Sequence, residues 1–184
     1  INEDNNLHYC EKIEATNPCG EIPIPPNGCC CLGSVDLTKF IQNPFGINGE
    51  ITVDWKSLTE TVGVAVRMLD NVLDATTWPL EEQRLEAMNK RRIGLGITGL
   101  GDALIMMKLA YDSEEARLVA NEIMRVITHS AYWASIQIAK EKGAFPLFNA
   151  EKYLASGFAK RLPEDLRAAI KEWGIRNSHL ISIA

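Results

Sequence analysis

The spacing of apolar residues along the chain changes near position 50. After Gly49 they recur every three to four residues, which is the period of an amphipathic helix, and Asp54 is placed to cap the first turn. The residues predicted to share the buried face of this helix are Trp55, Leu58, Val62, Ala65, Leu69, Val72 and Leu73. Pro79, followed by two glutamates, predicts the start of a second helix.

The helical period continues through the second half of the chain. Asp112 and Glu115 form a capping-box pattern, which predicts the start of a long amphipathic helix that ends at Gly143. Two shorter helices are predicted over residues 149–156 and 163–173, each closed by a glycine.

The first 50 residues differ in kind, being rich in Asn, Pro, Gly and Cys. Two strand-like runs, LHYCEKIEA and CLGSVDLTKFI, flank a loop whose prolines exclude helix and limit strand pairing. The final run, SHLISIA, predicts a buried strand. We therefore expect a single partial α/β domain, mostly helical: a strand–loop–strand unit over residues 1–50, a helical part over 51–174 and a strand over 175–184.

Charge and composition narrow the functional classes. A net charge of −5 argues against a nucleic-acid-binding face, and the one dense basic run, Lys90–Arg92, is interpreted as a helix end rather than a phosphate site. No apolar run reaches the ~20 residues that span a bilayer, and the polar N-terminus is not a signal peptide. Five cysteines without a secretory signal predict free thiols in the cytoplasm. Because the chain lacks an initiator methionine and ends inside an apolar run, we expect it to be a piece of a longer protein.

Two weak motifs carry little functional weight. Gly94, Gly96 and Gly99 have dinucleotide-binding spacing, but the segment before them is helical, so close strand-to-helix packing is the favoured explanation. The three histidines lack zinc-finger spacing, and His129 is interpreted as an ordinary polar position on a helix. The adjacent cysteines 29–31 cannot all face one tetrahedral ion, so no metal site is predicted.

The segment NPCGE holds the sharpest candidate chemistry. In an extended loop, Asn17, Cys19 and Glu21 would project to the same side. An amide that holds a hydroxyl, a thiol that reacts and a carboxylate that moves a proton form a coherent catalytic set. Cys19 could instead be a small buried hydrophobe, and the spacing alone leaves both interpretations open.

At these residues the sequence resembles the large catalytic chain of a ribonucleotide reductase, of the class II, adenosylcobalamin-dependent type. The resemblance covers essentially the whole chain and is carried by ATNPCGEIPIPPNGCCCLGSVDL, RMLDNVLDATTWPLEEQ, KRRIGLGITGLGDALI, EKGAFPLF and GIRNSHLISIA. It implies a ten-stranded α/β barrel in whose centre a finger loop carries NPCGE. Class I chains use a separate radical-generating subunit and differ around the cysteine, so the cobalamin type is favoured.

The resemblance also implies roles for individual residues. Cys19 matches the cysteine whose thiyl radical abstracts the 3′-hydrogen of the substrate ribose, and Glu21 matches the carboxylate that takes the 3′-hydroxyl proton. Asn17 matches the amide that hydrogen-bonds the ribose hydroxyls. Cys30, eleven positions after Cys19, matches one cysteine of the redox pair. Cys29 and Cys31 have no assignable role, and partial desolvation of Glu21 is expected to raise its proton affinity.

Other parts implied by the resemblance fall outside the chain, among them the partner redox cysteine, the phosphate-binding loop and most of the cobalamin surface. We therefore expect the isolated chain to be inactive. The implied substrate is a ribonucleoside di- or triphosphate, with the diphosphate favoured. The implied partners are a thioredoxin-like or glutaredoxin-like reductant, the remainder of the enzyme and a second copy in a homodimer, with neither nucleic acid nor membrane.

A rival hypothesis is a helical structural or interaction domain whose cysteines are core residues or form a zinc clip. Under either hypothesis, the helices between Thr52 and Gly174 are expected to form the ordered core. Residues 1–30 are expected to be partly displaced or paired with another copy.

Overall fold

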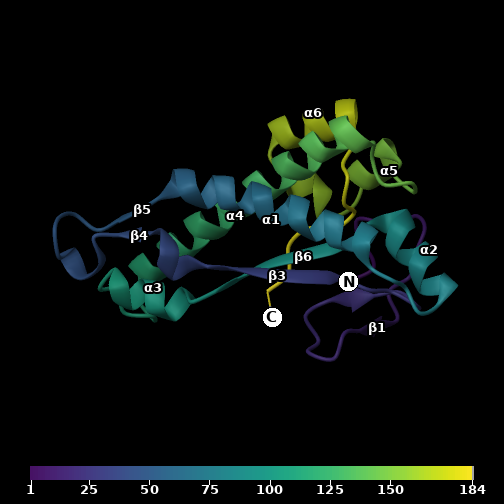
Figure 1. Ribbon diagram of the computed structural model, residues 1–184. Coiled ribbons are helices and arrows are strands. Elements are labelled where there is room, and N and C mark those ends of the chain that lie inside the picture. Colours follow the sequence, from purple (N-terminus) through teal and green to yellow (C-terminus); the bar gives the residue numbers. More distant parts are fainter. Residues whose placement is uncertain (184) are drawn as a thin grey trace.

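The structure is a computed structural model that describes residues 1–183 (Figure 1). Its α-helices are α1 (Trp55–Ala75), α2 (Glu81–Lys90), α3 (Leu100–Met106), α4 (Glu114–Lys142), α5 (Ala150–Leu154) and α6 (Glu164–Trp173). Its strands are β1 (Ala15–Thr16), β2 (Pro23–Ile24), β3 (Cys31–Asp36), β4 (Ile41–Gln42), β5 (Thr52–Val53) and β6 (Ile93–Thr98), and short 3-10 turns lie at Leu37–Phe40, Pro44–Gly46 and Ala159–Arg161. No helix among these residues is both long and apolar enough to cross a membrane.

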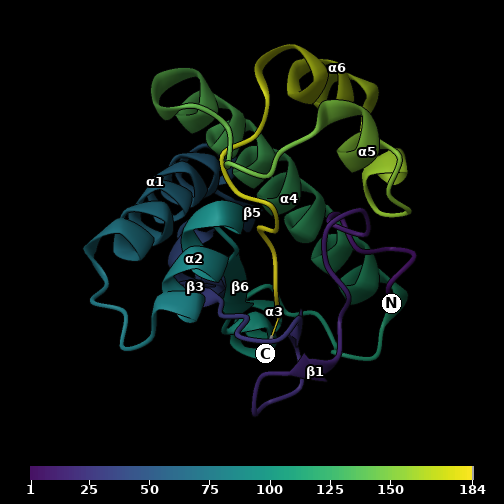
Figure 2. The same ribbon diagram turned by 90° about the vertical axis from the view of Figure 1, so that its right-hand side faces the viewer.

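Three parallel extended segments form the centre of the chain. β3 pairs in parallel with β6, from Cys31 opposite Ile93 to Asp36 opposite Thr98. On the other side of β6, the backbone of Leu95 receives the C-terminal segment: its N–H donates to the carbonyl of Leu180 (2.7 Å), and its carbonyl accepts from the N–H of Ser182 (3.2 Å). Figure 2 shows this segment running beside β6. The SHLISIA run thus pairs as predicted over its described residues, whereas β6 is a strand inside the part predicted to be helical.

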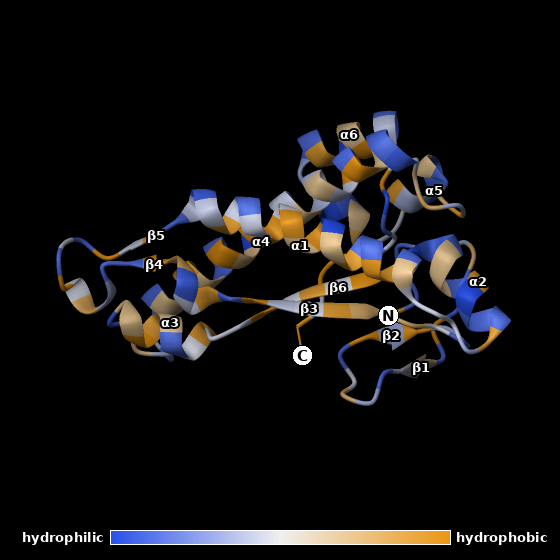
Figure 3. Cartoon of the chain, in the orientation of Figure 1, coloured by the Kyte–Doolittle hydropathy of each residue, from blue (hydrophilic) through white to orange (hydrophobic). Residues whose placement is uncertain are grey.

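Helices α1 and α4 form a layer over these strands. α1 packs on α4, and it also contacts β3 and β6 (Figure 1). Both apolar and polar residues lie along α1, as the hydropathy colouring shows (Figure 3) and as an amphipathic helix requires. The buried apolar residues of α1 are Leu58, Val62, Val66, Leu69 and Leu73. Trp55 and Val72, predicted on this face, are exposed to 37% and 41% because they lie at its margins.

Most of the predicted helix boundaries are confirmed. The carboxylate of Asp54 accepts from the N–H of Ser57 (3.0 Å) and caps α1, and α4 ends at Gly143 as predicted. The cap of α4 is shifted by one residue, because the hydroxyl of Ser113, rather than Asp112, accepts from the N–H of Ala116.

A buried carboxylate interrupts the apolar face of α1. Asp70 is fully buried, and its Oδ1 accepts from Arg91 Nε (2.7 Å) and Asn177 Nδ2 (2.9 Å). Its Oδ2 lies 3.3 Å from Arg176 Nε. These contacts join α1 to the start of β6 and to the C-terminal segment, so one side chain ties together three parts of the fold.

The N-terminal segment is packed rather than displaced. Leu7 is fully buried, and Asn6 Nδ2 donates to both the hydroxyl of Tyr153 and the carbonyl of Ser178, each at 3.1 Å. The run LHYCEKIEA was predicted as a strand, but it forms turns from which only Ala15 reaches a strand. The expected displacement and the expected strand are both absent from the start of the chain for one reason. Asn6 bonds to α5 and to the C-terminal segment, so this part of the chain is held without a neighbouring strand.

Replacing Gly96 by alanine should lower the free energy of unfolding by about 1–3 kcal/mol, the usual cost of overpacking a filled interior. A Cβ at this position would lie 2.5 Å from the backbone oxygen of Ser182, so the C-terminal segment would have to move away from β6. Chemical denaturation of the two chains measures the difference.

Gly63→Ala is the matched control for that substitution. Nothing lies within 4 Å of a Cβ added at Gly63, which is in the middle of α1. Because alanine is the better helix former by up to ~1 kcal/mol, this variant should be neutral or stabilised. Equal losses for the two variants would show that the close approach at Gly96 does not limit the fold.

Candidate active site

The NPCGE segment forms the tip of a hairpin. β1 and β2 pair antiparallel, with Thr16 opposite Pro23, and the N–H of Asn17 donates to the carbonyl of Ile22 (3.2 Å). Within the tip, the N–H of Gly20 donates to the carbonyl of Asn17 (3.0 Å), and Gly20 has a φ of +85°, which favours glycine. The predicted extended loop is therefore wrong in its local geometry, because the segment is a tight turn.

The turn nevertheless brings the amide and the carboxylate together. Asn17 Nδ2 donates to Glu21 Oε1 (2.6 Å), and Asn17 Oδ1 accepts from the N–H of Ile22 (2.9 Å). The other carboxylate oxygen, Glu21 Oε2, is buried and has no hydrogen-bond partner among the described residues. One oxygen of Glu21 is thus held in place while the other is left able to accept a proton.

Cys19 lies exposed at the tip of this hairpin. The interpretation of Cys19 as a buried hydrophobe therefore does not describe the structure. Its sulfur is open to a reaction partner, while Asn17 and Glu21 are half-buried beside it.

Cys30 immediately precedes β3 and is half-buried. Burial raises the pKa of its thiol to about 12; Arg92 opposes this shift, and Cys29, Cys31 and Glu21 add to it. The neutral thiol is therefore strongly favoured, and the stability that this preference contributes is present below pH 9.0 and lost as the pH rises toward about 12.

The basic run lies at a helix end, as predicted, since α2 ends at Lys90 and Arg91 is its C-cap; the run is also buried. Lys90, Arg91 and Arg92 are each no more than 5% exposed. Arg92 Nη2 contacts Glu11 Oε1 (2.5 Å), and Lys90 Nζ lies 2.8 Å from Glu11 Oε2. Burial raises the pKa of Glu11, but Arg92 and Lys90 outweigh this effect, so its pKa is lowered. The sequence did not indicate this burial because Glu11, which pairs with the run, is distant in the sequence.

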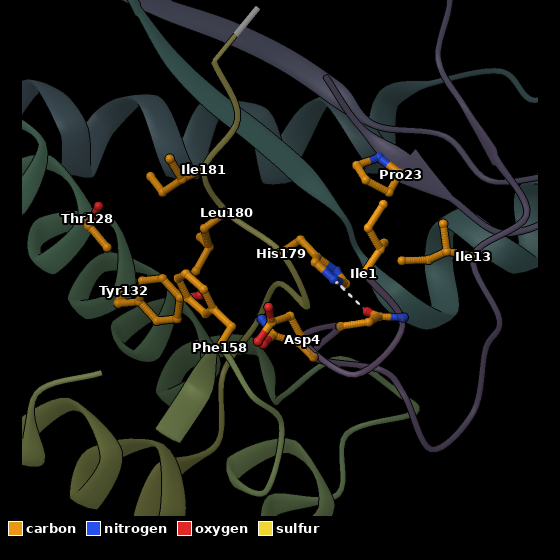
Figure 4. A pocket seen from close by; sticks show the side chains of 12 residues that line it. Ile1, Asp4, Ile13, Pro23, Thr128, Tyr132, Phe158, His179, Leu180 and Ile181 are labelled. Atoms are coloured by element: carbon orange, nitrogen blue, oxygen red, sulfur yellow. Dashed lines mark hydrogen bonds between the residues drawn. The ribbon is translucent and has the colours of Figure 1, made fainter. Parts of the chain in front are cut away.

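A cavity of about 460 Å³ lies beside the base of the hairpin (Figure 4). Its wall includes Pro23 from β2 and His179 from the C-terminal segment. It also includes two aromatic side chains, Tyr132 from α4 and Phe158 from the loop after α5. His179 Nε2 lies 3.0 Å from Asn5 Oδ1, the contact drawn as a dashed line. Burial, with Arg92 and Lys90 acting in the same direction, holds the pKa of His179 well below its ordinary value, so this wall of the cavity is uncharged at neutral pH.

The weaker sequence motifs resolve into structural roles. Gly94 and Gly96 lie inside β6, where they let the neighbouring extended segments approach, so the contact they permit is strand-to-strand rather than strand-to-helix. His129 contacts Asp165 (2.9 Å) on the helix surface. Among residues 1–183, no group of three or more His, Cys, Asp or Glu side chains is arranged to hold a metal ion, so nothing in this part of the chain supports the zinc clip.

The parallel βαβ arrangement defines part of an α/β domain, and the hairpin adds an exposed cysteine to it. The whole chain, residues 1–184, matches the family model described as "Ribonucleotide reductase, barrel domain". The chain therefore belongs to the ribonucleotide reductase family.

Individual relatives agree with this assignment. The chain is 42% identical over 157 residues to a vitamin B12-dependent ribonucleoside-diphosphate reductase of Mycobacterium tuberculosis (strain CDC 1551 / Oshkosh), covering 85% of this chain and 22% of the relative. It is 36% identical over 161 residues to the protein of the same name from Thermoplasma acidophilum, covering 88% and 20%. It is 27% identical over 206 residues to a ribonucleoside-diphosphate reductase subunit alpha of Chlamydia pneumoniae, covering 98% and 19%. The chain thus spans about a fifth of the length of these relatives.

Arg92 and Glu11 are the residues near the hairpin that sequence reasoning missed. A signal was present in part, because the charges of a dense basic run need partners when they are buried. Only the structure pairs Arg92 with Glu11 and bonds Arg92 to Pro23 at the base of the hairpin.

Proposed function

We propose that this chain carries the radical-cysteine end of a ribonucleotide reductase active site, in an enzyme that reduces ribonucleoside diphosphates to deoxyribonucleotides. The observation that supports it is the hairpin tip: an exposed Cys19 on the turn in which Asn17 holds one oxygen of Glu21 and leaves the other free. The names of the relatives support the diphosphate as substrate.

Each group of the hairpin has a task in this reaction. The sulfur of Cys19, as a thiyl radical, takes the hydrogen atom from C3′ of the ribose. The free oxygen of Glu21 takes the proton of the 3′-hydroxyl, which eases the loss of the 2′-hydroxyl as water. Asn17 keeps the carboxylate oriented, and its amide is placed to bond the ribose hydroxyls.

The reducing equivalents come from two thiols. In balance, a ribonucleotide and two thiols give a deoxyribonucleotide, one water and one disulfide. Cys30 supplies one of these thiols, and the second belongs to a part of the enzyme outside this chain. A thioredoxin-like or glutaredoxin-like dithiol then reduces the disulfide and is itself oxidised.

Adenosylcobalamin is the cofactor that the relatives' names favour. When bound, it would supply the oxidising equivalent that turns the Cys19 thiol into a radical. The exposed sulfur at a hairpin tip fits this requirement, since an electron or hydrogen atom can reach it directly. We assign no residue of this chain to cofactor binding.

We further propose that β3, β6 and the C-terminal segment are strands of a ten-stranded barrel, completed by the remainder of the enzyme. The hairpin is its finger loop. A homodimeric enzyme in the cytoplasm completes the proposal, and the isolated chain is expected to be inactive because it lacks the second redox thiol and the phosphate-binding loop.

Replacing Cys30 by serine in the longer protein tests the redox assignment. We expect deoxyribonucleotide formation to fall by about 100-fold or more both in a single turnover and in steady state with a dithiol protein, since the disulfide that balances each reduction cannot form without Cys30. Rapid-quench and steady-state assays measure the two results.

Cys29→Ser is the matched control, because it removes the neighbouring thiol, whose pKa burial also raises, to about 11. This variant should keep steady-state turnover. Unchanged turnover in Cys30→Ser, or equal losses in both variants, would remove Cys30 from the redox pair.

A further inference from the structure

Arg92 joins three segments at the base of the hairpin. Its Nη1 donates to the carbonyl of Pro23 in β2 (2.8 Å), and its Nη2 pairs with Glu11 in the N-terminal segment (2.5 Å). Its own backbone leads into β6. Its positive charge acts to lower the pKa of the Cys29 and Cys30 thiols and of the His179 imidazole.

Few hydrogen bonds other than those of Arg92 connect the hairpin to the rest of the described chain. Among the described residues 1–183, the bond from Arg92 to Pro23 is the only hydrogen bond that residues 14–29 make with any residue beyond position 30. Every other hydrogen bond of this segment is internal to it, such as those of the β1–β2 ladder and of the turn at Asn17. Apart from the packing of the buried Ile22 and Pro25, the orientation of the hairpin relative to β6 is therefore set by hydrogen bonds from one guanidinium.

The guanidinium can do this because it is fixed in turn. Both oxygens of Glu11 are engaged: Oε1 by Arg92 and by Asn5 Nδ2 (2.9 Å), and Oε2 by Lys90. The side chains of Arg92 and Glu11 are 5% and 1% exposed, so neither is free to turn into solvent. A planar fork with two arms suits this task, since one arm can hold the carboxylate while the other holds the carbonyl.

The same group acts on Cys30. The charged and titratable groups that influence the Cys30 thiol are Arg92, Cys29, Cys31 and Glu21, and Arg92 is the only cation among them. A fixed positive charge favours the thiolate, which is the form that attacks a disulfide and the form that leaves when a disulfide is reduced. The anchoring of the hairpin and the positive charge that acts on Cys30 therefore both come from the side chain of Arg92.

We propose that Arg92 is a positioning residue for the Cys19 and Cys30 site, which fastens the base of the hairpin to the start of β6 and brings a positive charge to that base. The proposal rests on the proposed function for its catalytic meaning. Its two physical parts, anchoring and charge, are separable by substitution: lysine keeps the charge and loses the two-armed fork, whereas glutamine loses both.

The test uses the longer protein with Arg92→Lys or Arg92→Gln. Hydrogen exchange of the Asn17 and Ile22 amides, both bonded within the hairpin, reports anchoring. Alkylation of Cys30 by iodoacetamide as a function of pH, followed by mass spectrometry, reports charge. We expect both variants to speed exchange by about tenfold, and only Arg92→Gln to slow Cys30 alkylation at pH 8, also by about tenfold, which corresponds to one pKa unit.

Arg91→Lys is the matched control. Arg91 is equally buried and ion-paired, but its partners are Asp70 and Asp74 on α1. This variant should lose stability while both readouts at the hairpin stay as in the parent. Lysine at position 92 keeps the buried charge paired, so the anchoring test remains available if the glutamine variant does not fold.

The outcomes separate the two proposals. If Arg92→Lys exchanges like the parent or like Arg91→Lys, the anchoring role is overturned, and if Arg92→Gln leaves the alkylation profile unchanged, the charge role is overturned. Neither readout requires turnover. A failure of the radical chemistry would show only in the cysteine variants, and so it is distinguishable from a failure at Arg92.

Discussion

Replacing Cys19 by serine in the longer protein should reduce nucleotide reduction by about 10⁴-fold or more, the scale of loss when an essential covalent group is removed from an enzyme. A hydroxyl holds its hydrogen more strongly than a thiol does, so serine cannot form the radical that takes hydrogen from C3′. The side chain is exposed, and the structure describes no hydrogen bond to its sulfur, so the substitution should leave folding unchanged. Steady-state product formation and thermal unfolding measure the two effects.

Cys10→Ser is the control for this experiment, because Cys10 is also exposed but lies in the N-terminal segment. It should retain full activity. Turnover within tenfold of the parent in Cys19→Ser would refute the radical assignment, and with it the proposed function, whatever the behaviour of Cys30 or Arg92.

The largest expected effect on stability is that of Asp70→Ala. Removing this carboxylate leaves the buried guanidinium of Arg91 without its main partner and Asn177 without an acceptor. Breaking one side of a buried ion pair costs about 3–5 kcal/mol, which is a large share of the ~5–15 kcal/mol that stabilises a typical domain. Urea denaturation monitored by circular dichroism gives the change in the free energy of unfolding.

Asp74→Ala is the comparison, since Asp74 contacts the same arginine (2.8 Å) from a side chain that is 42% exposed. An exposed pair contributes about 0–1 kcal/mol, so this variant should be close to the parent. Similar losses at the two positions would show that burial does not set the strength of these pairs.

The helices could be predicted from the sequence because their signals are local. The period of α1, its cap at Asp54 and the stop of α4 at Gly143 involve residues within one or two turns of each other. Strand β6 was missed for the opposite reason. Its glycines and apolar residues acquire a strand conformation only beside β3 and the C-terminal segment, and its partners are about 60 and 85 residues away in the sequence.

Buried charges were the other gap. Asp70 is an acidic residue of α1, and Lys90–Arg92 stand at the end of α2. From the local sequence alone, charged side chains at both places are expected to face solvent. Their burial is possible only because Arg91 meets Asp70, and Glu11 meets Arg92, across the fold. Pairing at such separations is a property of the tertiary structure that periodicity does not contain.

The candidate site was predicted in its composition but not in its conformation. Spacing placed Asn17 and Glu21 on one side of an extended loop, whereas the structure brings them together through a turn at Gly20. The resemblance to the family indicated the residues, and the hydrogen bonds indicate how they are held. The anchoring by Arg92 followed from neither.

The contacts of Asn6 have a consequence for how the chain assembles. Its amide bonds to Tyr153 and Ser178, across 147 and 172 residues. Contacts of such length are slow to form, because a long loop must close before any of them is gained. During synthesis Asn6 thus remains without these partners until Tyr153 and Ser178 have been made, and the segment that bears Glu11 docks late. The base of the hairpin is then completed only when both ends of this chain have met.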